Sequence, residues 1–307
     1  HDGDLWNGRV VAGAHAANGV GEVIGISSIR EWGLIETPIL LTNSQSAGAV
    51  YDATVRWLCE REPGAGIDDA VMPVVGECDD GLLNDLRGMH VREEHVRAAL
   101  ESAGDGPVAE GCVGAGTGMS CYDFKAGIGT SSRVAVAHGT PYVVGVLALT
   151  NFGVRHRLSI DGVPVGRAIA DLMPVENREG SCIVVLATDA PLSARQCRRM
   201  AARCSLGLAA TGSYASDGSG EIMVAFSTAH RIPRVSKELV ALTSVSNDEM
   251  SELFEAAVDA TAESVCNSLT AASTTVGRAG NTVHALPLDR LVETLRRAGR
   301  EARLPHA

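Results

Sequence analysis

The chain has 307 residues, 45% apolar and 21% charged, which is enough apolar material for one large core or two modest ones. Its formal net charge of −11 argues against a nucleic-acid partner, because no excess of basic residues is present to neutralise phosphates. None of its eight cysteines forms a C-x-x-C pair, which argues against zinc-ribbon and thioredoxin-like sites. No apolar stretch reaches about 18 residues and the first residues show no signal pattern, so neither a membrane span nor secretion is expected. Free thiols then favour the cytoplasm.

Four short runs have the composition of buried strands. They are residues 38–42 (PILLT), 142–150 (YVVGVLALT), 182–188 (CIVVLAT) and 221–226 (EIMVAF). Each is dominated by apolar residues, many of them β-branched, over a length typical of a strand. They predict a buried sheet layer.

Three helices are marked by the residues at which they begin. Ser193 with Gln196, and Ser246 with Glu249, have the spacing of capping boxes, and Pro287 is expected to open the last helix. Apolar residues at helical spacing follow each start, and these faces are expected to pack in the core. They are Cys197, Met200, Ala201 and Cys204 in the first helix, Met250, Leu253, Phe254, Ala257, Val258 and Val265 in the second, and Leu288, Leu291, Val292 and Leu295 in the third.

No internal repeat, low-complexity tract or interdomain linker interrupts the chain, so residues 1–307 are expected to form a single domain. The mixture of strands and helices indicates an α+β or α/β architecture of stacked layers. One segment is typical of a processing loop: residues 175–180 (VENREG) are polar and end in glycine just before a predicted strand.

Two patterns that resemble ligand sites fail their spacing tests. Residues 114–133 are rich in glycine but lack the G-x-x-x-x-G-K-[ST] of a phosphate loop, since Lys125 is followed by alanine, so tight turns in the core are expected there. His90 and His95 are separated by about 140° of rotation on a helix and cannot face one metal ion together. We therefore expect no metal and no cofactor.

A nucleophile is predicted at Ser181. The chain lacks a G-x-S-x-G elbow, but Gly180 and Ser181 stand at the mouth of a predicted strand. The hydroxyl of such a serine can attack the preceding carbonyl, and glycine gives the backbone the freedom to bend there. Once the chain is cut, Ser181 carries both a hydroxyl and an α-amine with a reference pKa of roughly 8, so nucleophile and base reside on one residue.

Nearly the whole chain resembles the DmpA-type L-aminopeptidase/D-esterase family, self-processing serine hydrolases that are related to the β-peptidyl aminopeptidases. The resemblance lies in ordered, dispersed blocks. They are LTNSQSAGAVYDATVRW from Leu41, PVVGECDDGLLNDLRG from Pro73, GPVAEGCVGAGTGM from Gly106, FKAGIGTSSR from Phe124, GSCIVVLATDAPL from Gly180, SGEIMVAFSTAH from Ser219 and GRAGNTVHALPLDRL from Gly277.

The resemblance implies a fold, a processing step and a set of site residues. The fold is a layered αββα sandwich of the DmpA/ornithine-acetyltransferase type. Cleavage between Gly180 and Ser181 would give an α fragment, 1–180, and a β fragment, 181–307, whose pairs assemble into homo-oligomers such as tetramers. Ser181 would be the nucleophile and Asn151 the amide that binds the oxyanion, an effect worth about 3 to 4 kcal/mol. Ser219 and Glu221 would hydrogen-bond toward the nucleophile and its amine, and alternation along a strand puts their side chains on one face.

The resemblance also places Asp79 beside the substrate and the oxyanion site, where the family carries an apolar or aromatic residue. A carboxylate there is expected to alter selectivity. The leading interpretation is an aminopeptidase, amidase or esterase that acts on small peptides, D-amides, β-peptides or esters. Two alternatives stay open: an acyltransferase with the same Ser181 nucleophile, in which an amine replaces water, and an uncleaved scaffold without activity.

Overall fold

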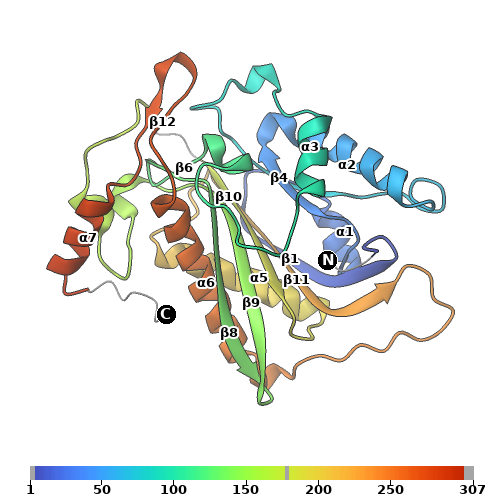
Figure 1. Ribbon diagram of the computed structural model, residues 1–307. Coiled ribbons are helices and arrows are strands. Elements are labelled where there is room, and N and C mark those ends of the chain that lie inside the picture. Colours follow the sequence, from blue (N-terminus) through green and yellow to red (C-terminus); the bar gives the residue numbers. More distant parts are fainter. Residues whose placement is uncertain (1–3, 177–179, 301–307) are drawn as a thin grey trace.

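The computed structural model describes residues 4–176 and 180–300, and these residues form four layers in the order helices, sheet, sheet, helices (Figure 1). This is the αββα sandwich that the resemblance implies. The larger sheet has the strand order β3-β1-β11-β10-β9-β8, and the smaller sheet has the order β2-β5-β4. Within the larger sheet β10 and β11 are parallel, whereas β9 runs antiparallel to β10.

The elements have the following bounds. The larger sheet contains β1 (Gly8–Gly19), β3 (Leu34–Ile35), β8 (Ile128–Ala137), β9 (Thr140–Asn151), β10 (Ser181–Thr188) and β11 (Gly220–Pro233). The smaller sheet contains β2 (Val23–Ile24), β4 (Ile39–Asn43) and β5 (Val74–Cys78), and two short hairpins pair β6 (Ser120–Cys121) with β7 (Phe124–Lys125) and β12 (Thr275–Val276) with β13 (Thr282–Val283). The α-helices are α1 (Ile26–Trp32), α2 (Ala47–Arg61), α3 (Glu93–Glu101), α4 (Val165–Ala168), α5 (Ala194–Ala210), α6 (Ser251–Thr270) and α7 (Leu288–Arg297).

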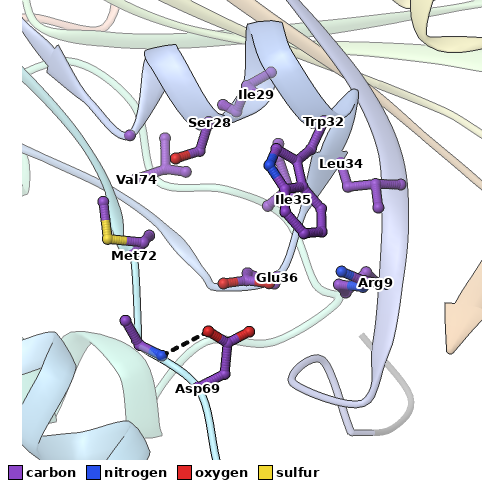
Figure 2. Close-up of a pocket in the computed structure, with 12 residues that line it drawn as sticks. Arg9, Ser28, Ile29, Trp32, Leu34, Ile35, Glu36, Asp69, Met72 and Val74 are labelled. Atoms are coloured by element: carbon purple, nitrogen blue, oxygen red, sulfur yellow. Dashed lines mark hydrogen bonds between the residues drawn. The ribbon is translucent and has the colours of Figure 1, made fainter. Parts of the chain in front are cut away.

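The smaller sheet is covered by α2 and α3, while α1 lies at the side where β1 pairs with β3 (Figure 1). Beside α1 lies a cavity of about 170 Å³, into which Trp32 and Met72 project from its walls (Figure 2). At its rim Arg234 forms ion pairs with both Glu36 and Asp69, at 2.6 and 2.7 Å. These ion pairs tie the turn between β3 and β4 to the loop before β5 and to the end of β11.

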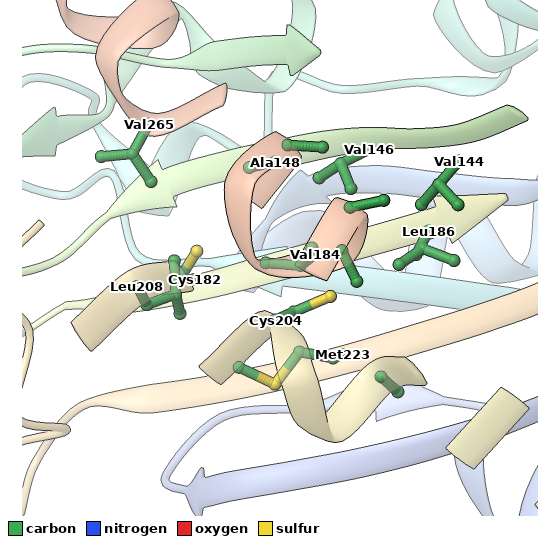
Figure 3. Packing of buried hydrophobic residues seen from close by; sticks show 14 of the residues in the cluster. Val144, Val146, Ala148, Cys182, Val184, Leu186, Cys204, Leu208, Met223 and Val265 are labelled. Atoms are coloured by element: carbon green, nitrogen blue, oxygen red, sulfur yellow. The ribbon is translucent and has the colours of Figure 1, made fainter. Parts of the chain in front are cut away.

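The helices α5 and α6 cover the opposite face of the larger sheet. Alternate residues of β10 point to opposite faces of the sheet, so Val184 and Leu186 pack against these helices (Figure 3) while Ile183 faces the smaller sheet. Cys204 and Leu208 of α5 belong to the same helix-side cluster. The central strand is therefore buried on both sides, which is why its sequence reads as an unbroken apolar run.

All four predicted strands form, and three of them extend further than predicted. The run 38–42 corresponds to β4, 142–150 to β9, 182–188 to β10 and 221–226 to the much longer β11. The glycine-rich segment 114–133 contains the expected tight turn, a 3-10 turn at Gly114–Gly118 that packs in the core, but its last residues form β8.

The capping box of α5 is confirmed, and the second predicted box is wrong. Ser193 accepts a hydrogen bond from the backbone of Gln196, and the Gln196 side chain accepts one in return. Ser246 and Glu249 instead contact His138: Ser246 Oγ lies 3.2 Å from its Nε2, and Glu249 Oε2 accepts a bond from its backbone at 3.0 Å. A 3-10 turn (Asn247–Glu249) follows, and α6 begins at Ser251.

The last helix begins one residue later than predicted. Pro287 is the N-cap of α7 and Leu288 its first residue. Leu288 is 49% exposed and so does not belong to the core face on which it was predicted, whereas Leu291 is buried. Five of the eight cysteines are buried, and all eight are free thiols. Among the described residues, no helix has the length and apolarity needed to cross a membrane.

Candidate active site

Three strand ends meet around Ser181. Ser181 is the first residue of β10, where it pairs with Asn151 at the end of β9 and with Gly220 at the start of β11. Only 5% of its surface is exposed. Because Ser181 and Ile183 point to the same face of β10, the hydroxyl of Ser181 faces the space between the two sheets.

Asn151 lies on the same face as Ser181, since directly opposed residues of an antiparallel pair share a face. Its side chain is fixed at both ends: Nδ2 donates to the carbonyl oxygen of Asp79 at 2.7 Å, and Oδ1 accepts from the backbone of Ser120 at 3.0 Å. A side-chain amide has two N–H donors. One of them is bonded to Asp79, so the second remains on the face of the sheet that Ser181 shares. The structure thus places a rigid donor next to the predicted nucleophile.

The peptide bond before Ser181 lies against this donor. A Cβ atom added to Gly180 would stand 3.2 Å from Asn151 Nδ2 and only 1.6 Å from the Asn151 carbonyl oxygen, which explains why glycine fits there. The Gly180 carbonyl accepts a hydrogen bond from the backbone of Gly220 at 3.1 Å. Of the predicted processing loop 175–180, residues 177–179 lie outside the described residues.

Ser219 and Glu221 form a buried pair at the start of β11. Ser219 Oγ donates to Glu221 Oε1 at 2.5 Å, and Glu221 Oε2 is buried without a hydrogen-bond partner in the described parts of the chain. Burial raises the pKa of the Glu221 carboxyl, and the hydrogen bond from Ser219 lowers it in part. The Ser219 carbonyl accepts a bond from Asn18 Nδ2 at 2.6 Å, which anchors this strand end to β1.

The strand register separates this pair from the Ser181 hydroxyl. Glu221 pairs with Cys182, whose side chain faces α5 and α6, so Glu221 lies on the helix side of the sheet. Ser181 is paired with the intervening residue, Gly220. The carboxylate is therefore one strand away from Ser181 and on the other face, which suits contact with a backbone amine better than contact with the hydroxyl.

Asp79 follows directly after β5, and its side chain is exposed. One carboxylate oxygen accepts a hydrogen bond from the backbone of Gly81 at 2.7 Å, while the Asp79 carbonyl accepts the bond from Asn151. The backbone of Asp79 thus positions Asn151, and its carboxylate lies at the rim of the candidate site.

Sequence reasoning missed two residues of β5. Cys78 is fully buried in the same inter-sheet cluster as Ile183, and burial raises the pKa of its thiol far above the usual range, so Cys78 stays neutral on the face of the sheet toward which Ser181 points. Glu77 is also buried: its Oε1 accepts from the backbone of Glu22 at 2.9 Å and its Oε2 from Ser44. A signal was available, because a glutamate inside the apolar run VVGEC has to be buried and satisfied if that run forms a strand.

Behind Asn151, the loop that carries Ser120 is held by Lys125. The ammonium of Lys125 is fully buried and donates to the carbonyl oxygens of Gly116 at 3.0 Å and Ala126 at 2.6 Å. Desolvation lowers the pKa of Lys125. In the described part of the chain, no three His, Cys, Asp or Glu side chains are grouped to hold a metal ion.

A four-layer αββα sandwich with a candidate nucleophile at the start of a central strand defines the class of N-terminal-nucleophile hydrolases. Within that class, the chain belongs to peptidase family S58, whose family model matches residues 1–283. It is 42% identical over 295 residues to beta-peptidyl aminopeptidase BapA of Sphingosinicella microcystinivorans, across 91% of this chain and 74% of that protein. The chain is thus a hydrolase of the peptidase class.

Solved structures agree with this assignment. The beta-aminopeptidase of a Burkholderia species superposes with a TM-score of 0.91 at 42% identity, covering 98% of this chain and 85% of that one. The L-aminopeptidase D-Ala-esterase/amidase of Ochrobactrum anthropi, described as a variant of the Ntn hydrolase fold, gives a TM-score of 0.92 at 39% identity and covers 96% and 83%. These relatives favour the hydrolase over the acyltransferase.

Proposed function

We propose that this chain is a self-processing serine aminopeptidase and amidase that removes residues from the free amino end of small peptides, amides or esters. The observation that carries the proposal is the pairing of Ser181 with Asn151 on one face of the sheet, beside the Gly180–Ser181 peptide bond. A nucleophile and a fixed oxyanion donor on the same face of the sheet are the two groups that acyl transfer requires.

The first reaction is on the chain itself. Ser181 Oγ attacks the carbonyl carbon of Gly180, the C–N bond breaks, and an ester forms as the Ser181 nitrogen takes up the hydroxyl proton. Water then hydrolyses the ester, which leaves a carboxylate on Gly180 and a free α-amine on Ser181. The single domain 1–307 would remain folded as an α fragment of 180 residues and a β fragment of 127 residues.

Turnover repeats this chemistry on a substrate. The α-amine of Ser181 accepts the hydroxyl proton as Oγ attacks the substrate carbonyl, and it returns that proton to the leaving amine. The free N–H of Asn151 stabilises the negative charge that develops on the carbonyl oxygen. Water then attacks the acyl-enzyme and releases the acid. No step draws on a group from outside the chain other than water and the substrate.

Glu221 is assigned to the ammonium groups of this cycle. A buried carboxylate oxygen without a partner is costly unless a cation or donor reaches it. Cleavage creates a new amine on the backbone of Ser181, on the strand next to Glu221, so Glu221 supplies the opposite charge that the protonated amine requires. Ser219 orients this carboxylate through its hydrogen bond.

The substrate class is inferred from the relatives and from Asp79. The relatives are described as acting on β-peptides, L-amino-acid peptides and D-alanine esters or amides. All share a short acyl group with a free amine, and we propose that this is also the substrate here. An exposed carboxylate at position 79 should favour acyl groups with an additional positive charge.

We also propose that the processed units assemble into a homo-oligomer, such as a tetramer, and that the protein works in the cytoplasm. Apolar side chains exposed after β11, with Val235 at 81% and Leu239 at 102%, support the assembly. Eight free thiols support a reducing compartment. Light scattering coupled to size-exclusion chromatography measures the first, and the elution mass of one αβ unit would contradict it.

The function is tested with an aminoacyl p-nitroanilide and its N-acetylated counterpart. Wild type should hydrolyse the first and not the second, and both Ser181→Ala and Glu221→Gln should be inactive or nearly so. Ser227→Ala is the matched control, because Ser227 is fully buried and donates to the Ala190 carbonyl at 2.6 Å, away from the site. Equal rates on the two substrates, or an active Ser181→Ala, would contradict the proposal.

A further inference from the structure

A second cavity of about 540 Å³ lies at the open edge of β1, between α1 and α5, and contains none of the candidate active-site residues. The short β3 pairs with β1 only at Val10 and Val11. The last backbone hydrogen bond on this side of β1 runs from Ala12 to the Gly33 carbonyl, at 2.8 Å. Beyond that point, no described strand pairs with β1 on this side. The volume is that of a site for a small molecule.

The walls of this cavity are basic. Arg30 comes from the last turn of α1, Arg195 and Arg198 come from the first turns of α5, and His15 projects from β1. Of the described residues that line the cavity, none is acidic. This is unusual in a chain with a net charge of −11.

Among the described residues, the three guanidinium groups have no hydrogen-bonded or acidic partner. Within residues 4–176 and 180–300, no carboxylate forms an ion pair with Arg30, Arg195 or Arg198, whereas Arg97 and Arg290 each have an acidic partner. Three cations that converge on a cavity without partners repel one another. An anion in the cavity would remove that repulsion.

The three arginine side chains are exposed, and the backbone brings their attachment points to the walls of the cavity. Residues 195 and 198 lie three apart on a helix and so share one face. Gly13 lets α5 approach β1 closely, since a Cβ there would be 2.3 Å from the Arg198 backbone nitrogen. The alternation of an antiparallel strand turns the N–H of Ala14 toward the same open edge as that of Ala12, which adds a neutral donor to the charged ones.

We propose that this cavity binds a small multivalent anion with at least two phosphate or carboxylate groups. Arginine matches both groups, because its planar guanidinium donates two parallel hydrogen bonds to a pair of oxygens. Two adjacent arginines on α5 would hold one anionic group, and Arg30 on the opposite wall would hold the other. An anion with a single charged group would leave the arginines on one wall without a partner. The ligand is therefore expected to carry two or more such groups.

His15 provides a reporter inside the site. Burial lowers the pKa of its imidazole, and the charges of Arg198 and Arg30 lower it further. Arg195 faces the same cavity from α5, and the neighbouring strand places the uncharged Met223 opposite His15. A bound anion cancels the field of the arginines, so the pKa of His15 should rise when the ligand binds and fall back when it is removed.

The test is isothermal titration with pyrophosphate and, separately, citrate, at constant ionic strength in about 0.15 M sodium chloride, so that screened surface attraction contributes little. We expect saturable binding of one of the two with a Kd of about 1 mM or tighter. The tighter of the two identifies a phosphate or a carboxylate ligand. Acetate should not bind. Arg195→Ala/Arg198→Ala should weaken binding at least tenfold.

Arg203→Ala is the matched control, because Arg203 lies on the same helix but stacks 4.2 Å from the Phe254 ring instead of facing the cavity. It should bind as wild type does. NMR titration of His15 gives a second readout that does not depend on activity. Binding of neither ion, equal binding by the double variant, or an unmoved His15 titration would overturn the proposal.

Discussion

Replacing Asn151 by alanine tests the part of the site on which both proposed reactions depend. The side chain makes two hydrogen bonds in the folded chain, to the Asp79 carbonyl and from the Ser120 backbone. Its remaining N–H is the proposed oxyanion donor. Asn151→Ala removes all three interactions and leaves the strand pairing with Ser181 intact, because that pairing is made by the backbone.

The expected losses differ in size for stability and for catalysis. A neutral hydrogen bond contributes about 1 kcal/mol to folding, so the variant should remain folded. One oxyanion donor contributes about 3 to 4 kcal/mol to the transition state, which corresponds to a loss of roughly 10²- to 10³-fold in kcat. An oxyanion also forms on the Gly180 carbonyl when Ser181 attacks it, so self-cleavage should slow in this variant as well.

Asn267→Ala is the matched control for this variant. Asn267 also donates from Nδ2 to a backbone carbonyl, that of Thr130, at 2.8 Å, but it lies on α6 away from the site. We would measure Tm, the rate of fragment appearance, and kcat per processed chain for both variants. Similar Tm losses with a kcat loss in Asn151→Ala alone support the oxyanion role. A kcat within threefold of wild type would refute it.

Three further predictions concern charge at the site. Because burial raises the pKa of Glu221 and the charged form is the active one, kcat/KM should begin to fall on acidification above the ordinary glutamate pKa of about 4.3, and a rate that stays flat to pH 4 would contradict this. Ionisation of the same carboxyl has the opposite effect on stability, because it lowers the free energy of unfolding as the pH rises. Glu221→Gln in a Ser181→Ala chain should therefore have a higher Tm at neutral pH than Ser181→Ala alone. A lower Tm would count against the assignment. Basic aminoacyl amides should exceed neutral and acidic ones in kcat/KM and lose that lead in Asp79→Leu. Exposed charges contribute only about 0 to 1 kcal/mol, so a preference below about fivefold, or a ranking unchanged in the variant, would leave Asp79 with its backbone role alone.

Local signals in the sequence predicted local structure well. The capping box of Ser193 and Gln196 formed from these two residues alone, as their spacing predicts. The box at Ser246 failed because His138, distant in the sequence, contacts both Ser246 and Glu249. The exposure of Leu288 has a similar origin: helical spacing gives a face, but only the packed fold decides which part of that face is covered.

The first strand of the larger sheet, β1, is one that sequence reasoning missed. β1 (GRVVAGAHAANG) is rich in glycine and alanine, which have low strand propensity, and it forms through its long pairing with β11. This strand carries Asn18, which anchors Ser219, and His15, which lines the basic cavity. Neither of these contacts can be predicted from the sequence without knowing how β1 pairs with β11.

For the candidate site, the sequence and the resemblance to a family selected Ser181, Asn151, Ser219 and Glu221, and the structure brings them to three adjoining strand ends. What the sequence could not supply is the face on which each side chain lies. The register puts Asn151 with Ser181 and puts Glu221 on the opposite face, which separates the oxyanion role from the amine role.

The central claim is that the chain cuts itself before Ser181, and intact mass spectrometry with N-terminal sequencing of the purified protein tests it most directly. Wild type should give two fragments, 180 and 127 residues long in the printed sequence, with serine as the first residue of the smaller one. Ser181→Ala should give a single chain. An active protein that remains one chain, or a smaller fragment that begins at any other residue, would contradict the account.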